Sequence, residues 1–211
     1  MGDTFDLVAA ERRRTADFLD TLDDDQGATP SLCSRWTVRE VAAHLVMPFR
    51  IRTPQLLFRM VRYAGNFDRL SEDFAEKAGS EPLSQLAADL RANAGHRFTP
   101  PTLGPEAPLT DVVVHTLDMR VPLDAGTGDI TPEALDPMLA FLMTPKATRG
   151  FLPKGRTAGL SFRSTDTGWS AGEGPEVRGP GASLALALTG RRAGLDALEG
   201  EGAEELRRRL G

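Results

Sequence analysis

The sequence contains a single cysteine, Cys33, so no internal disulfide can form. Freedom from disulfides is typical of proteins in reducing compartments, and we therefore expect a cytoplasmic protein. Cys33 lies beside a stretch of proline and serine with no activating residue near it in the sequence, so it is predicted to have no chemical role. If thiol chemistry takes place here, the thiol is expected to come from outside the chain.

Long hydrophobic runs are also missing. No segment approaches the roughly 20 apolar residues that are needed to cross a bilayer. The first residues, MGDTFDLVAAERRR, lack the basic segment and the long apolar stretch of a secretory signal. We therefore expect no membrane partner.

Positive charge is not in excess, because the formal net charge is −5 and is spread along the chain. A nucleic-acid-binding protein usually carries a basic stripe or patch. The basic clusters here, ERRR and LRRRL, are short and typical of solvated helix faces. We predict no nucleic-acid partner.

The hydrophobic pattern divides the chain into two parts. Up to residue 145 the apolar residues recur with helical spacing, and the part from 156 onwards alternates in the manner of short strands. We expect a four-helix-type bundle over 1–145 and a small α+β domain over 156–211, joined near 145–156. The expected helices cover 4–22, 37–45, 53–65, 67–79, 82–98, 110–121, 131–143, 182–192 and 203–210, and the expected antiparallel strands lie in 157–166 and 168–179.

The segment TDVVVHTLDMR, residues 110–120, places polar groups in an apolar helix. Asp111 and His115 are four residues apart and share one helical face, and Asp118 lies one turn further on the same stripe. Because its other positions are mostly apolar, this helix is expected to be buried. A buried carboxylate and imidazole are costly unless they are paired or bind a metal.

A third ligand is available from the segment WTVREVAAHL. His44 shares a face with Val41 and Leu45 and is expected to point into the bundle, whereas His96 lies at a helix end before two prolines and is expected to be exposed. A site of His44, Asp111 and His115 has two imidazoles and one carboxylate and leaves positions open for water or substrate, as catalytic zinc sites do.

Simpler interpretations remain open. Asp111 can lie in the first turn of its helix and complement the helix dipole, and His115 can be a core histidine bonded to a carbonyl. Thr37 and Glu40 form the pattern of a capping box, which would occupy Glu40 with backbone nitrogen. Trp36 precedes this box and is predicted to be a structural residue that packs on the helix.

The segments RWTVREVAAHL and LTDVVVHTLDMRVPL, together with the C-terminal run 162–210, resemble the mycothiol-dependent maleylpyruvate isomerase family, a branch of the DinB-like metal-binding bundles. The resemblance implies a divalent metal, usually zinc, held by His44, Asp111 and His115, with Asp111 in place of the family's glutamate. It implies mycothiol as the thiol cosubstrate. It also implies an arginine of the C-terminal part near the site, with Arg191 the first candidate and Arg178 the second.

Together these features predict a metal-dependent enzyme that uses a low-molecular-weight thiol on a small electrophile, as an S-transferase or an isomerase. Asp118 is expected either to orient His115 as its hydrogen-bond partner or to be a surface acid near the helix end. A hydrolase that uses a metal-bound water, and a non-enzymatic protein that binds a metal or small ligand, are the alternatives.

Overall fold

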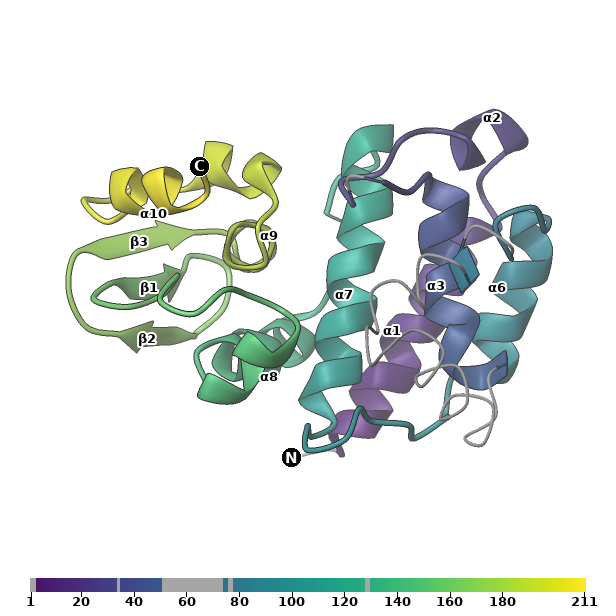
Figure 1. The fold of residues 1–211 in the computed structure, drawn as a ribbon, viewed down its shortest axis with the longest axis horizontal. Helices are drawn as coiled ribbons and strands as arrows, with labels where there is room; N and C mark the ends of the chain where they lie inside the picture. Colours follow the sequence, from purple (N-terminus) through teal and green to yellow (C-terminus); the bar gives the residue numbers. More distant parts are fainter. Residues whose placement is uncertain (1–2, 34, 51–73, 76–77, 128–129) are drawn as a thin grey trace.

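A computed structural model describes residues 3–33, 35–50, 74–75, 78–127 and 130–211 of the chain. Figure 1 shows a group of long helices on one side and a small sheet with short helices on the other. The helices predicted over 53–65 and 67–79 lie wholly or largely outside the described residues. None of the helices described here is long and apolar enough to cross a membrane.

Among the described residues, four longer helices of the larger part each pack against two of the others. The pairs in contact are α1 with α6 and α7, and α3 with α6 and α7. A buried hydrogen bond of 2.7 Å between the hydroxyls of Thr15 and Thr116 ties α1 to α7. The bounds are Thr4–Leu19 for α1, Val38–Arg50 for α3, Leu83–Ala92 for α6 and Glu106–Arg120 for α7, with a short α2 over Asp24–Gly27.

The start of α7 differs from the prediction. The helix begins at Glu106 and not at residue 110, because Pro108 is tolerated within the first turn, where its missing N–H has no helical partner. Glu106 takes the first turn, which favours a negative charge. Asp111 therefore lies in the second turn, and its interpretation as a first-turn dipole partner is wrong.

One α-helix and two 3₁₀ turns lead from the bundle towards the sheet. α8 spans Pro132–Leu142 and begins with proline at a position where its fixed φ suits a helix. It packs against α7 and α9, so the apolar side chains form one continuous core that runs from Val8 to Leu206. Two 3₁₀ turns flank it, Val121–Leu123 and Pro145–Arg149.

The sheet has three strands in the order β2–β1–β3, and the prediction of antiparallel strands is wrong for one of its two pairings. β1 (Ser161–Ser164) pairs with β2 (Ser170–Gly172) in antiparallel fashion but with β3 (Glu176–Gly179) in parallel. The three residues between β2 and β3 pass closely across the start of β1. Gly174, with φ +120°, has room for no side chain there, because a Cβ would lie 2.3 Å from the carbonyl oxygen of Gly159.

α9 (Gly181–Leu188) and α10 (Ala203–Arg209) cover the sheet, with a 3₁₀ turn, Arg192–Ala197, between them. α9 ends as predicted near Gly190, which adopts φ +99°. The N–H of Gly190 bonds to the carbonyl of Ala187, and the N–H of Arg191 bonds to that of Leu186. This pair of bonds is a Schellman motif, and it fixes the direction in which the chain leaves the helix.

Candidate metal centre

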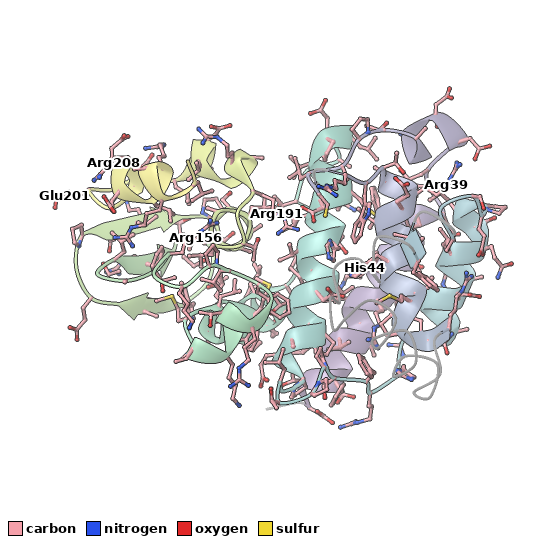
Figure 2. The ribbon with its side chains drawn as sticks, in the orientation of Figure 1. Arg39, His44, Arg156, Arg191, Glu201 and Arg208 are labelled. Atoms are coloured by element: carbon pink, nitrogen blue, oxygen red, sulfur yellow. The ribbon has the colours of Figure 1, made fainter. Side chains whose placement is uncertain are left out.

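α3 and α7 bring His44, Asp111 and His115 together, and we call these three residues the triad. The Oδ1 atom of Asp111 lies 3.5 Å from Nε2 of His44 and 3.5 Å from Nε2 of His115. The two imidazole rings lie 4.8 Å apart, centroid to centroid, in an edge-to-face arrangement. All three sequence-predicted ligands therefore present an atom to a common point, inside the bundle where Figure 2 labels His44.

The spacing of these atoms distinguishes a metal site from a hydrogen-bonded cluster. A separation of 3.5 Å is longer than the usual N–H···O distance of about 2.9–3.0 Å. Ligands arranged tetrahedrally at about 2.0–2.2 Å from a zinc ion lie about 3.3–3.6 Å from one another. The donor set and the two distances from Asp111 are thus compatible with a divalent ion of zinc's size.

Asp111 is held in its charged form. Burial alone would raise the pKa of its carboxyl group, but the interaction with His44, followed by the charges of His115 and Arg12, lowers the pKa to about 2. The carboxylate is therefore ionised over the whole range in which proteins usually function. An ionised carboxylate is the form that binds a metal.

Asp118 lies behind His115 on the same helix and is fully buried. Its Oδ2 atom is 3.0 Å from Nδ1 of His115. Burial would raise the pKa of Asp118, but its hydrogen bonds to His115 and Arg191 lower it below the usual value. Because Asp118 is ionised, Nδ1 of His115 carries the hydrogen and donates a hydrogen bond to Asp118. The lone pair of Nε2 then faces the point that the three residues of the triad share.

Arg191 reaches Asp118 from the C-terminal part of the chain. Its Nε and Nη2 atoms donate to the two carboxylate oxygens of Asp118 at 2.9 and 2.6 Å, and Nη1 donates to the carbonyl of Thr189 at 2.8 Å. The Schellman motif explains this placement, because Arg191 comes directly after Gly190 and its N–H makes one of the two bonds of the motif. Figure 2 shows Arg191 between the two parts, on the side of α7 that faces the sheet.

The structure places the other sequence candidates away from the triad. Arg178, on β3, is exposed and pairs with Glu199 at 3.2 Å. His96 is exposed as expected, and its ring packs against Phe49. Glu40 accepts from the backbone nitrogen of Thr37 at 2.7 Å, which is the predicted capping box. The interpretation of His115 as a core histidine bonded to a carbonyl is wrong, since its partner is Asp118.

Two neighbours of the triad were not predicted. The ring of Trp36 lies 5.0 Å from that of His44 and 6.2 Å from that of His115, so this side chain packs on the site itself. Cys33 presents its sulfur within 4.8 Å of ligand atoms of His115 and Asp118. Cys33 therefore has potential activating groups near it in space that the sequence did not reveal, and its lack of a chemical role stays a prediction. Both residues lie on the loop before α3, and no local spacing signals that this loop meets α7.

The triad has no fourth protein ligand among the residues that the structure describes. Cys33 groups with His115 and Asp118 and not with His44 and Asp111. An ion held by three protein ligands keeps a coordination position for a small molecule, which is the arrangement of catalytic sites.

Comparisons with known proteins identify a family and a fold for this chain. Residues 8–120 match the family model described as the mycothiol maleylpyruvate isomerase N-terminal domain. Among solved structures the chain is similar to the mycothiol-dependent maleylpyruvate isomerase, with 14% identity, a TM-score of 0.56, and coverage of 95% of this chain and 92% of the other. A histidine-to-alanine variant of that enzyme matches with 15% identity and the same TM-score and coverage. No curated protein matches the chain.

Proposed function

The chain belongs to the mycothiol maleylpyruvate isomerase family through its N-terminal domain, and on that premise we propose that it is a metal-dependent enzyme that adds mycothiol to a small electrophile. Retention of the adduct makes the reaction an S-transfer, and release of the thiol after rotation about a bond makes it an isomerisation. The family membership supports the thiol, and the solved isomerase, which shares the fold, is named for the same thiol.

The observation that carries the metal dependence is the position of Asp111. One carboxylate oxygen stands 3.5 Å from the Nε2 atoms of both histidines, at the separation expected of ligands around one ion. We propose that His44, Asp111 and His115 hold the ion and that zinc is the metal, because imidazole and carboxylate ligands in a three-ligand site suit it. When bound, such an ion stabilises a thiolate, the nucleophilic form of a thiol whose free pKa is about 8.5.

The protein's own groups would then orient the ligands and exclude water. Asp118 holds the proton of His115 on Nδ1, and Arg191 keeps Asp118 ionised and fixed. The ring of Trp36 covers the imidazole of His44. These contacts hold the two imidazoles towards the point that Asp111 also faces.

The test combines metal analysis of the purified protein with thiol consumption over a panel of electrophiles. We expect about one divalent ion per chain and turnover only when metal, mycothiol and electrophile are all present. His115→Ala is expected to lose both the metal and turnover, since two remaining ligands hold an ion poorly. Asp111→Glu, which restores the acid usual in the family, is expected to keep the metal and to change the preference among electrophiles.

Two results would overturn this proposal. Turnover by the metal-free protein would remove the metal from the mechanism. Turnover by the metal-loaded protein with no thiol present would instead indicate a hydrolase, in which the open position holds a water activated near neutral pH.

A further inference from the structure

Cys33, His115 and Asp118 form a second group of metal-binding side chains, which overlaps the triad, and we call it the sulfur group. The sulfur of Cys33, one nitrogen of His115 and one carboxylate oxygen of Asp118 all lie within 4.8 Å of one another. Cys33 is half-buried, whereas Asp118 is fully buried. The proposed chemistry uses Asp118 only as the support of His115 and assigns no step to Cys33, so it does not account for this convergence.

Main-chain hydrogen bonds fix the loop that brings Cys33 to α7. The backbone N–H of Leu32 donates to the carbonyl oxygen of Asp118 at 3.0 Å, which ties the residue before Cys33 to the helix that carries His115. The N–H of Cys33 donates to the hydroxyl of Ser31 at 3.1 Å, and its carbonyl accepts from the same hydroxyl at 3.2 Å. The backbone of Cys33 is therefore held in place beside the other two members of the sulfur group.

The donor atoms of the sulfur group suit a cation that prefers sulfur. Thiolate ligands select soft cations, whereas groups of oxygen ligands select hard ones such as Mg²⁺. Donor atoms in tetrahedral positions around one ion lie about 3.3–3.6 Å apart. The sulfur group therefore has to close by little more than about 1 Å at most, and rotation of the Cys33 side chain about its Cα–Cβ bond supplies a movement of this size.

His115 cannot serve both groups as a neutral imidazole. In the triad its Nε2 atom faces Asp111, and its Nδ1 atom carries the hydrogen that Asp118 accepts. A cation in the sulfur group takes the place of this hydrogen, between Nδ1 and the carboxylate of Asp118. Asp118 keeps its two bonds to Arg191, because each carboxylate oxygen has two lone pairs. The hydrogen then resides on Nε2, where it occupies the lone pair that the triad needs.

We propose that the sulfur group is a second metal site, selective for thiophilic cations such as Cd²⁺, and that its occupation expels the ion from the triad. As the cation enters, the thiol of Cys33 releases its proton to solvent and the hydrogen of His115 passes from Nδ1 to Nε2. No oxidant or reductant takes part. Binding of the cation depends only on the sulfur group, whereas the expulsion of zinc rests on the proposed function, because it requires a metal in the triad.

The first test adds Cd²⁺ alone to the metal-free protein. We expect a thiolate-to-cadmium charge-transfer absorption that saturates at about one ion per chain, and cadmium–nitrogen coupling in the NMR spectrum should identify Nδ1 of His115 as a ligand. His115→Gln should weaken the affinity at least about tenfold, because it removes a ligand. Asp111→Asn is the matched control, since it alters the triad but not the sulfur group and should keep the absorption. Equal affinity in wild type and His115→Gln would show that Cys33 binds Cd²⁺ by itself and would overturn the site.

The second test adds Cd²⁺ to the zinc-loaded protein. Zinc that is released is separated by filtration and measured by elemental analysis. We expect wild type to release zinc as Cd²⁺ binds, and Cys33→Ser to require at least about tenfold more Cd²⁺, because Cd²⁺ then competes only at the triad. Cys33→Ala serves the same purpose if Cys33→Ser does not fold. Mg²⁺ has the same charge but avoids sulfur, and it should release no zinc from either protein.

The outcomes separate this inference from the proposed function. If Cd²⁺ binds through Cys33 and His115 while zinc stays in the triad, mutual exclusion through His115 is wrong. If the triad holds no zinc but Cd²⁺ still binds through Cys33 and His115, the proposed metal dependence is wrong and the second site is confirmed. If wild type and Cys33→Ser release zinc at the same Cd²⁺ concentration, the second site is wrong and the proposed function is unaffected.

Discussion

At the scale of single residues, the two histidines of the triad are oriented by different contacts. Nδ1 of His115 is bonded to a fully buried carboxylate, which a guanidinium grips in turn. His44 has the ring of Trp36 against one face, and its Nδ1 atom has no hydrogen-bond partner among the described residues. The electrostatic support of the site therefore comes mainly through His115, and Asp118 is the residue on which it depends.

Asp118→Asn is expected to weaken zinc binding about 10–100-fold, the usual effect of removing a carboxylate that supports a ligating histidine. The amide can present its oxygen to Nδ1, but it lacks the charge that favours the bound state. Competition with a chelating dye measures the affinity. Asp124→Asn makes the same change of charge at an exposed position and should bind zinc normally. An affinity equal to that of the wild type would show that Asp118 does not act through His115.

The carboxylate of Asp118 makes the stability of the metal-free wild type depend on pH in a defined direction, and Asp118→Asn removes this dependence. The pKa of Asp118 is lowered in the folded state and is about 3.9 in the unfolded chain, so its stabilising effect is present above pH 3.9. This effect is lost as the pH falls through the folded-state pKa. We expect the wild type to exceed Asp118→Asn by about 3 kcal/mol or more at pH 7, because the substitution leaves Arg191 buried and unpaired.

Chemical denaturation of both proteins between pH 7 and pH 3 measures this difference. The gap in the free energy of unfolding should shrink below pH 4, as Asp118 becomes protonated in the folded wild type. A gap that does not shrink between pH 4 and pH 3 would contradict the assignment of a lowered pKa to Asp118.

At the scale of elements, the local signals in the sequence served well where the contact partners are close in the chain. The four-residue spacing of Asp111 and His115, and the capping box of Thr37 and Glu40, depend only on helical geometry, and the structure shows both. The helical character of α9 and its end at Gly190 were predicted for the same reason.

Contacts between distant segments were not predictable in this way. The parallel pairing of β3 with β1 depends on a three-residue crossing that the alternation of apolar residues does not reveal. The approach of Cys33 to His115 depends on how a loop before α3 packs against α7. Periodicity reports which face of an element is buried, but it does not report what that face meets.

Gly190 is the element-level feature with the clearest consequence for the site. A φ of +99° suits glycine, and alanine there costs about 1–2 kcal/mol. We expect Gly190→Ala to lower the stability by at least this amount and to weaken zinc binding, because Arg191 would leave the helix end in a different direction. Gly95→Ala is the control, since that position has open space and an ordinary φ. Urea denaturation and the dye competition measure the two effects. Loss of stability with normal zinc affinity would show that the motif does not position Arg191.

At the scale of the whole molecule, Arg191 and α8 connect the bundle to the C-terminal part. The ion pair between Arg191 and Asp118 crosses from the segment after α9 to α7, and the apolar core continues across the same boundary. The division into domains at 1–145 and 156–211 stays a prediction about how these parts unfold. The shared core argues for one cooperative unit, whereas the change from helical spacing to alternation of apolar residues argues for two.

Zinc binding can decide between these possibilities. A ligand that binds only the folded state stabilises it by RT ln(1 + [L]/Kd), about 2.7 kcal/mol at a hundredfold excess over Kd. If the chain unfolds as one unit, hydrogen exchange of core amides in α9 and β3 should slow as much as exchange in α1, although zinc contacts only the bundle. Arg191→Ala should reduce the protection of α9 and β3 more than that of α1, because it removes the ion pair that joins them to the triad. If zinc slows hydrogen exchange only in α1, α3, α6 and α7 of the wild type, the C-terminal part unfolds independently of the bundle. The ion pair would then not couple zinc binding to the stability of that part.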